Sequence, residues 1–435
     1  MENKNKRFAI FTLGCKLNFS ESSGIARTLE GQGMTRVDFK EEADLYIIHS
    51  CSVTEQSDKK SRNIIRQAIR RNPNALVTVA GCYAQLKPDA IAQIKGVDLI
   101  LGTHEKYNLT SYISNFTKRE KAEIYTSKPA HIKSFHKAYS FGDRTRTFLK
   151  VQDGCDYFCT YCTIPLARGT SRSDTVENTV KEAQRIADTG VKEVILTGVN
   201  IGDFGRKNNE SFFDLVKALD EVEGIERYRI SSIEPNLLKD EIIEFVAHSK
   251  RFAPHFHIPL QSGSNDVLEL MERKYKREVF ESRVHKIKQE LPDAFIGVDI
   301  IAGTNGETDQ FFEDSYNFIR DLDVSQLHAF PYSERPNTKA LRIEGTVDVN
   351  ERKHRCQRLI ELSNRKLRHF YEQHIGETRP VIFEEQQNED IMYGFTDNYV
   401  RVETKYNAEL LNKLVNVKLS GILENGHVQA EIINA

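Results

Sequence analysis

Short apolar runs alternate with segments of helical periodicity along residues 7–101. The runs predict strands at 7–14, 45–50, 76–80 and 99–101, and the segments between them predict helices at 20–33, 54–71 and 88–95. Strands that alternate with helices build a parallel sheet with helices on its faces. Residues 1–125 are therefore expected to form an α/β domain around a parallel sheet.

The same alternation resumes at residue 147 and runs longer. It predicts strands at 147–152, 193–197, 227–231, 255–259, 295–301 and 326–330, with helices at 176–189, 211–221, 238–248, 277–290 and 308–322. Six β-α units are fewer than the eight of a closed parallel barrel. We expect a partial (β/α)6 barrel, followed by a long helix at 350–374, in a domain at 126–375.

The regions on either side of these units have a different character. Residues 104–146 are polar and weakly periodic, which predicts a linker with a hairpin of its own. Short β-rich runs follow the long helix at 380–384, 399–403, 414–419 and 428–433. They predict a small antiparallel β-barrel over 376–435.

Composition fits a soluble protein, with 39% hydrophobic and 29% charged residues. The start, MENKNKRF, is charged and lacks the apolar core of a targeting segment. No apolar run approaches the ~18–20 residues that span a bilayer, so we expect a cytoplasmic protein with no membrane partner. Because the net charge is only -2, a nucleic-acid partner would have to be bound by local basic patches.

The seven cysteines are the candidate chemical groups. Their odd number and the lack of a secretion signal favour metal ligands or catalytic groups over disulfides. Cys15, Cys51 and Cys82, here called the first triplet, each follow a predicted strand. Ligands of open parallel sheets bind beyond the carboxyl ends of the strands, so these thiols are expected to converge on one rim. The alternative is three buried structural cysteines, which is also what we expect of Cys356.

Cys155, Cys159 and Cys162, here called the second triplet, have the spacing Cys-x3-Cys-x2-Cys. Three thiolates on one short loop can hold an iron–sulfur cluster, and three ligands leave one iron of a cubane cluster open for a substrate or cofactor. Structural zinc needs four ligands, commonly two CxxC pairs, and the sequence has no second pair. A thioredoxin-like motif would leave Cys155 unexplained.

Six longer motifs are spread over the whole chain. They are TLGCKLN at 12–18, SCSVT at 50–54, GCYAQ at 81–85, VQDGCDYFCTYCTIPLARG at 151–169, HIPLQSGS at 257–264 and PYSERPNTKA at 331–340. Together they resemble the methylthiotransferase branch of the radical S-adenosylmethionine (SAM) superfamily. The domain order also resembles that family: a cysteine-bearing α/β domain, a radical SAM barrel and a TRAM-type β-barrel.

The resemblance implies two [4Fe-4S] clusters and SAM, which serves as radical source and as methyl donor. The second triplet would hold the cluster that binds and cleaves SAM, and the first triplet would hold an auxiliary cluster that carries or donates the inserted sulfur. The cofactors would perform the difficult chemistry, so no protein acid or base is assigned. An external electron donor and a sulfur source are the implied partners.

The family further implies SAM-binding groups near the carboxyl ends of the barrel strands, where the active sites of parallel barrels form. The candidates are Tyr161, Gly198, Asn200, Ser231, Ser232, Glu234, Gln261 and Asp299. For each polar residue the alternative is that it simply ends a strand.

The motifs around the first triplet most resemble the type that adds a methylthio group to carbon 2 of N6-threonylcarbamoyladenosine at tRNA position 37. Two other enzyme substrates remain open, namely N6-isopentenyladenosine in tRNA and a side chain of a ribosomal protein. Outside the enzymes, an iron–sulfur RNA-binding or electron-transfer protein remains open.

Two basic helical segments are candidates for binding the anticodon loop of tRNA. Residues 59–71 hold six basic residues and no acidic one, and 352–368 hold seven basic residues and one acid. Basic side chains on a helix can contact phosphates, although a solvated helix face has the same composition. The RNA-binding candidates are Lys59, Lys60, Arg62, Arg66, Arg70, Arg352, Lys353, Arg355 and Arg358.

Overall fold

The computed structural model describes residues 5–113, 116–142, 145–384 and 390–433. The first four residues of the charged start, and parts of the expected linker and of the expected small barrel, lie outside these ranges. The chain divides into two compact units. Unit 1 comprises Met1–Asp143, Phe148–Ser173 and Ser333–Thr338, and unit 2 comprises Arg144–Thr147, Asp174–Tyr332 and Lys339–Ala435.

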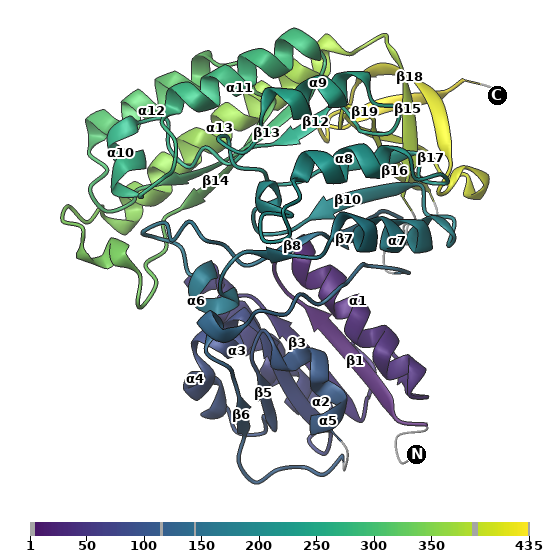
Figure 1. The fold of residues 1–435 in the computed structure, drawn as a ribbon, viewed down its shortest axis with the longest axis vertical. Coiled ribbons are helices and arrows are strands. Elements are labelled where there is room, and N and C mark those ends of the chain that lie inside the picture. The colour runs from purple at the N-terminus through teal and green to yellow at the C-terminus, as the bar shows by residue number, and fades with distance from the viewer. Residues whose placement is uncertain (1–4, 114–115, 143–144, 385–389, 434–435) are drawn as a thin grey trace. The chain divides into compact units, whose positions relative to one another are not determined.

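Unit 1 is built on a parallel sheet with the strand order β2-β1-β3-β4-β5-β6 (Figure 1). The strands are β1 (Arg7–Thr12), β2 (Thr35–Arg36), β3 (Leu45–Ser50), β4 (Leu76–Gly81), β5 (Leu99–Leu101) and β6 (Glu123–Tyr125). The helices are α1 (Lys16–Gly31), α2 (Glu55–Arg71), α3 (Cys82–Leu86), α4 (Pro88–Ala92) and α5 (Leu109–Tyr112), with 3-10 turns at Glu105–Asn108 and Pro129–His131.

Helices cover both faces of this sheet because its central strands are apolar on both sides. On β3, Leu45 and Ile47 belong to an apolar cluster that includes side chains of α1 and α5. Their neighbours Tyr46 and Ile48 belong to a second cluster that includes side chains of α2 and α4. The helix after β1 and the helix after β3 therefore lie on opposite faces, which makes the boundary between β1 and β3 a topological switch point.

The expected linker contributes an unpredicted strand to the sheet, and near its end Tyr139 pairs antiparallel with Leu149. β6 pairs in parallel with β5, with Leu99 opposite Glu123 and Leu101 opposite Tyr125. A three-residue strand at the sheet edge gives too little alternation to be recognised in a polar stretch. Residues 114–115 and 143–144 of the expected linker lie outside the described residues.

The unit 1 segment Phe148–Ser173 begins inside strand β7 (Thr147–Lys150). The first residue of that strand, Thr147, is assigned to unit 2. It contains β8 (Gln152–Asp153), the short helix α6 (Ile164–Arg168) and β9 (Arg172–Ser173). β8 and β9 pair antiparallel, with Asp153 opposite Arg172. The pairing closes a loop that contains the whole second triplet.

Unit 2 contains parallel strands that alternate with helices. The strands are β10 (Glu193–Thr197), β11 (Arg227–Ile230), β12 (His255–His257), β13 (Phe295–Ala302) and β14 (Gln326–Pro331). The helices are α7 (Val176–Ala187), α8 (Phe212–Asp220), α9 (Asp240–His248), α10 (Asn265–Leu270), α11 (Arg277–Glu290) and α12 (Asp309–Asp321), with 3-10 turns at Ile201–Asp203 and Lys339–Arg342. β10 pairs with β11, and β13 pairs with both β12 and β14.

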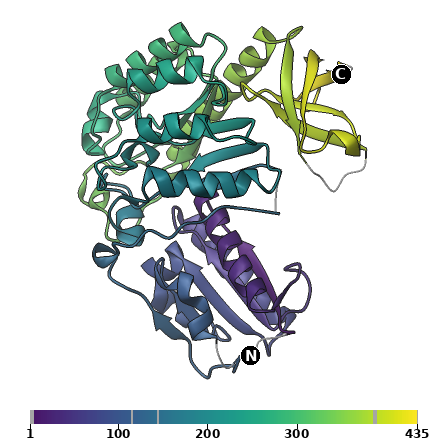
Figure 2. The same cartoon turned by 45° about the vertical axis from the view of Figure 1, so that its right-hand side comes forward.

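A long helix, α13 (Val349–Gln373), leads to a closed five-stranded barrel in unit 2 (Figure 2). Its strands are β15 (Thr378–Phe383), β16 (Ile391–Thr396), β17 (Arg401–Lys405), β18 (Leu414–Ile422) and β19 (Val428–Ile432), with a 3-10 turn at Ala408–Leu410. The barrel is not wholly antiparallel, because β17 and β19 pair in parallel. Phe370 and Tyr371 at the end of α13 join the apolar core of the barrel. Among the described residues, no helix has the length and apolar character needed to cross a bilayer.

Candidate functional site

The first triplet lies at the carboxyl ends of three neighbouring strands. Cys15 follows β1 as the N-cap residue of α1, Cys51 follows β3, and Cys82 is the first residue of α3 after β4. β1, β3 and β4 are adjacent in the sheet. The strand order therefore places all three cysteines on one rim of unit 1, around the switch point, where open α/β sheets bind ligands.

Two glycines allow the loops at this rim to approach closely. Gly14 and Gly81 both have a φ of +100°, which residues with a side chain rarely adopt. A Cβ at Gly14 would lie 2.7 Å from Cβ and 2.9 Å from Sγ of Cys51. A Cβ at Gly81 would lie 2.7 Å from Cδ2 of His49 and from the carbonyl oxygen of Ser50. Since each glycine precedes a cysteine, a side chain at either position would push the cysteine loops apart.

Asn18 ties two of these loops together. Its side-chain amide donates to the carbonyl oxygens of Leu13, at 2.7 Å, and Ser50, at 3.3 Å. The Ser50 hydroxyl in turn donates to the carbonyl oxygen of Ala80 at 2.6 Å. These bonds fix the backbone just before each cysteine of the first triplet.

Burial and neighbouring charges alter the ionisation of two thiols of the first triplet, Cys51 and Cys82. Burial raises the pKa of Cys51 to about 12, and the charges of Cys82 and Cys15 act in the same direction. Burial also raises the pKa of Cys82, against the lowering effect of Arg168. Because iron is bound by thiolates, these cysteines need a nearby positive charge or a metal to ionise.

The donor set fits a cluster better than a single ion. Among the described residues, no three Cys, His, Asp or Glu side chains gather closely enough to hold one metal ion. A cubane cluster is larger than one ion and spreads its thiolate ligands over several irons. Three cysteines on three adjacent loops, brought near one another by glycines, suit that larger group.

The second triplet lies on the loop between β8 and α6. The backbone N–H of Cys155 donates to the carbonyl oxygen of Gly169 at 3.0 Å, and that of Cys162 donates to the carbonyl oxygen of Cys159 at 3.0 Å. A Cβ at Gly154 would lie 2.1 Å from the carbonyl oxygen of Thr170. The start and end of the loop are therefore in contact, and the cysteines follow one another around a closed turn.

Arg335 connects the distant segment Ser333–Thr338 to the first triplet. Its guanidinium donates to the hydroxyl of Ser52 at 2.7 Å and to the carboxylate of Asp58 at 2.8 Å. Asp58 is fully buried and also pairs with Lys87 at 2.9 Å. Removing one partner of such a buried ion pair costs about 3–5 kcal/mol. Arg335 thus stabilises the loop immediately after Cys51, a role that sequence reasoning missed although the residue lies in the motif at 331–340.

The candidate SAM residues divide between the units. Tyr161 lies on the second-triplet loop in unit 1, and the other seven lie in unit 2. Within unit 2, Gly198 and Ser231 directly follow β10 and β11, and Asp299 lies on β13. Isolated bridges pair Ser232 with His257 and Gln261 with Ile300. These seven candidates are therefore brought to one edge of the parallel strands, while their binding of SAM stays a prediction.

The polar side chains at this edge of unit 2 include an unusual carboxyl group. Burial raises the pKa of Glu234 to about 7, although the ion pair with Arg273 opposes the rise. Asn200 is buried and donates to Asp203 at 3.3 Å. The buried hydroxyl oxygen of Ser231 has no hydrogen-bond partner in the described part of the chain. An unsatisfied buried hydroxyl is costly, so this position suits a polar ligand.

Sequence reasoning missed two histidines at the same edge. His257 on β12 pairs with Asp299 on β13 at 2.9 Å. The ring of His257 stacks on that of His328 from β14, with centroids 5.2 Å apart. His257 begins the motif at 257–264, which was the available signal, whereas His328 lies in no motif.

The basic candidates on α2 are mostly exposed. Lys59, Lys60, Arg66 and Arg70 all face solvent. Arg62 is partly buried and donates to the hydroxyl of Tyr83 at 3.1 Å. Lys59, Arg66 and Arg70 are seven and four positions apart, so these three share one face of α2.

The basic candidates on α13 need correction. Arg352 is buried and donates to the carbonyl oxygen of Val347 at 2.9 Å. Arg355 is buried and pairs with Glu307 at 2.9 Å. These guanidiniums stabilise unit 2 internally and cannot reach phosphates. Lys353 is exposed, and Arg358 is partly buried in an ion pair with Glu313.

Two family models and a solved structure define the class of protein. The model described as "Uncharacterized protein family UPF0004" matches residues 7–102, and that of the Radical SAM superfamily matches residues 149–319. The radical SAM methyltransferase TsrM from Kitasatospora setae has a TM-score of 0.57 at 14% identity, over 77% of each chain. The chain therefore has a radical SAM fold, and it is an enzyme of a class that uses a [4Fe-4S] cluster and SAM.

Curated relatives narrow the class further. The chain is 41% identical to threonylcarbamoyladenosine tRNA methylthiotransferase MtaB of Bacillus subtilis, over 94% of this chain and 93% of that protein. It is 36% identical to MtaB of Aquifex aeolicus, over 94% and 99%. It is 30% identical to tRNA-2-methylthio-N(6)-dimethylallyladenosine synthase of Alkaliphilus oremlandii, over 96% and 90%. The chain belongs to the radical SAM methylthiotransferase family, as its motifs predict.

Proposed function

We propose that this enzyme adds a methylthio group to carbon 2 of N6-threonylcarbamoyladenosine at position 37 of tRNA. The observation that carries the proposal is the presence of both cysteine triplets in one compact unit. Methylthiolation needs one site that activates SAM and another that delivers sulfur. The higher identity to MtaB proteins, 41% against 30% for the dimethylallyladenosine type, favours this nucleoside.

In this proposal each triplet holds a [4Fe-4S] cluster with one open iron. When bound, these groups and SAM supply the radical, the sulfur and the methyl group. Tyr161 and the seven unit 2 candidates contact SAM, with the Ser231 hydroxyl as a hydrogen-bonding group. An external electron donor and a sulfur source complete the set of partners.

The finer architecture belongs to the same proposal. Residues 1–125 form the methylthiotransferase domain, 126–375 the partial (β/α)6 radical SAM barrel, and 376–435 a TRAM-like barrel. The closed barrel of β15–β19 supports the last assignment. An enzyme that modifies tRNA in this way works in the cytoplasm.

Product formation tests the function directly. Anaerobically reconstituted enzyme with SAM, a one-electron reductant and tRNA that contains N6-threonylcarbamoyladenosine is expected to yield the methylthio nucleoside, detected by mass spectrometry of digested tRNA. Offering tRNA with N6-isopentenyladenosine, or ribosomal protein, tests the two other substrates. Failure to cleave SAM under every condition would instead favour an iron–sulfur RNA-binding or electron-transfer protein.

The exposed face of α2 is proposed to contact tRNA phosphates. Replacing Lys59, Arg66 and Arg70 with glutamine is expected to weaken tRNA binding and to reduce its salt dependence, because each lost phosphate contact removes about 0.7–0.9 from the slope of log K against log salt. Filter binding across a salt series measures both quantities.

The matched control removes the same charge elsewhere. Lys181, Lys217 and Lys239 are surface lysines of unit 2, with side chains 61%, 47% and 66% exposed. Replacing these three with glutamine is expected to leave the slope near the wild-type value. An equal change in both triple variants would mean that net charge, and not the α2 face, determines binding.

A further inference from the structure

A network of buried charges lies between the two triplets in unit 1. Glu21 of α1 is its centre and accepts from Arg168 in two bonds of 3.0 Å, from Lys150 at 2.9 Å and from Lys106 at 2.5 Å. Asp153 accepts from Arg168 at 2.9 Å, from Lys150 at 2.9 Å and from Arg172 at 2.7 Å. All six side chains are buried.

The network has more positive than negative charge. Four cations, Lys106, Lys150, Arg168 and Arg172, face two carboxylates, and no other acidic side chain of the described residues bonds to them. Burial alone would raise the pKa of Glu21, but Arg168, Lys106 and Lys150 hold it well below its usual range. Glu21 is therefore ionised, and the network holds four basic side chains against two carboxyl groups.

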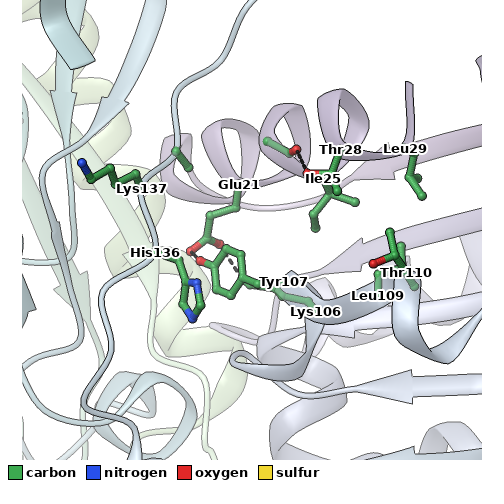
Figure 3. Close-up of a pocket in the computed structure, with 12 residues that line it drawn as sticks. Glu21, Ile25, Thr28, Leu29, Lys106, Tyr107, Leu109, Thr110, His136 and Lys137 are labelled. Atoms are coloured by element: carbon green, nitrogen blue, oxygen red, sulfur yellow. Dashed lines mark hydrogen bonds and ion pairs between the residues drawn. The ribbon is translucent and has the colours of Figure 1, made fainter. Parts of the chain in front are cut away.

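The other neighbours of Glu21 do not supply the missing charge. The Tyr107 hydroxyl donates to Glu21 at 2.6 Å, as the dashed line in Figure 3 marks, and burial raises its pKa well above the usual range. Tyr107 is therefore neutral. The same figure shows His136 beside Tyr107, and the two rings stack with their centroids 4.0 Å apart. Both residues line a cavity of about 200 Å³, and the His136 ring carries no negative charge.

The excess charge borders the first triplet. Arg168 donates to the side-chain oxygen of Asn18 at 2.7 Å, and Asn18 is the residue that fixes the loops before Cys15 and Cys51. Nζ of Lys106 lies 3.2 Å from Nε2 of His49. The His49 ring lies against Gly81, which is the residue before Cys82. The Asn18 side-chain oxygen that accepts from Arg168 also lies 4.0 Å from Sγ of Cys15.

Buried charge without a partner is strongly unfavourable in a protein interior. A cubane core bound by three thiolates has a net negative charge, and reduction by one electron adds another. An anionic cluster on the first triplet would therefore balance the excess positive charge, and the balance improves when the cluster is reduced.

We propose that Arg168, held by Glu21 and Asp153, is a positioning residue whose positive charge raises the reduction potential of the cluster on the first triplet. The inference rests on the proposed function, because it requires that cluster. Arg168 belongs to the second-triplet loop, six residues after Cys162. The loop that holds one cluster thus supplies the counter-charge for the other.

The test uses a full-length Cys155→Ala/Cys159→Ala/Cys162→Ala parent, so that only the first triplet can bind a cluster. Arg168→Gln and Arg168→Lys are made in this parent, and a redox titration followed by electron paramagnetic resonance gives the midpoint potential. Arg168→Gln is expected to lower the ratio of reduced to oxidised cluster at least tenfold at a fixed ambient potential, about 59 mV for one electron. Arg168→Lys keeps the charge and is expected to restore most of the potential.

Two further measurements distinguish a wrong inference from a variant that does not fold and from a parent that binds no cluster. If Arg168→Gln does not fold or bind iron, Lys106→Met removes a second charge of the network and is expected to lower the potential in the same direction. An unchanged midpoint potential in the charge-removing variant would overturn the inference. So would an Arg168→Lys variant whose potential falls as much as that of Arg168→Gln. Iron analysis of the parent is the separate check, because a parent without iron contradicts the proposed auxiliary cluster itself.

Discussion

Replacing Cys155, Cys159 and Cys162 with alanine is expected to abolish cleavage of SAM and to lower bound iron from about eight to about four atoms per chain. The three cysteines lie on one closed loop, so their loss removes one whole cluster and leaves the rim of the β1–β6 sheet intact. Anaerobic iron and sulfide analysis measures the clusters, and chromatography of 5′-deoxyadenosine measures cleavage.

The seventh cysteine provides the control for this experiment. Cys356 is buried in α13 of unit 2 and lies in neither triplet. Cys356→Ala is expected to retain both iron content and cleavage, with a loss of thermal stability from the small cavity that remains. Iron that falls from about four atoms to none in the triple variant would show that the first triplet holds no cluster.

Replacing Cys15, Cys51 and Cys82 with alanine is expected to have the opposite pattern. SAM is still cleaved, because the second triplet keeps its loop, but no methylthio nucleoside forms. The separation follows from the chain itself, since the two triplets lie on different backbone segments. Parallel assays of 5′-deoxyadenosine and of methylthio nucleoside on the same reaction mixture measure the two outcomes.

A single substitution tests the role of the first triplet without removing any cysteine. Gly14→Ala keeps all three cysteines but places a Cβ against Cys51 in a backbone conformation that favours glycine. It is expected to reduce iron at the first triplet while sparing cleavage. Methylthio product from the Cys15→Ala/Cys51→Ala/Cys82→Ala variant would remove the first triplet from the reaction.

Much of the fold could be predicted because its central strands are short, largely apolar runs between helices. The predicted strands 45–50, 99–101 and 193–197 coincide with β3, β5 and β10, and the predicted helix 277–290 coincides with α11. The same strand ends located the first triplet on one rim. In each case a local pattern is sufficient, because parallel order fixes which ends of the strands meet.

Elements whose partners come from distant parts of the sequence could not be predicted in this way. β16 (Ile391–Thr396) contains a glycine and follows a polar stretch of sequence, so its alternation is weak. The parallel pairing of β17 with β19 depends on how the barrel closes, which no local pattern determines. Likewise the basic character of α13 concealed buried ion pairs, because Arg355 meets Glu307 only in the folded unit.

The polar network of unit 1 shows the same limit for the site. Arg168 and Glu21 are 147 residues apart in sequence, and Arg168 and Asn18 are 150 apart. Each residue lies in or beside a motif, so its presence was visible, but its partner was not. A charge balance becomes apparent only when all six side chains are placed together.

The bond between Arg335 and Asp58 has a consequence for the order of events during protein synthesis. Asp58 leaves the ribosome 277 residues before its partner, which at about 5–20 residues per second is a delay of roughly 14–55 seconds. During that time Lys87 is the available cation for a carboxylate that ends fully buried. The loop after Cys51 therefore lacks its bonds to Arg335 until late in translation. A fragment that stops before residue 335 would keep the loop in that early state.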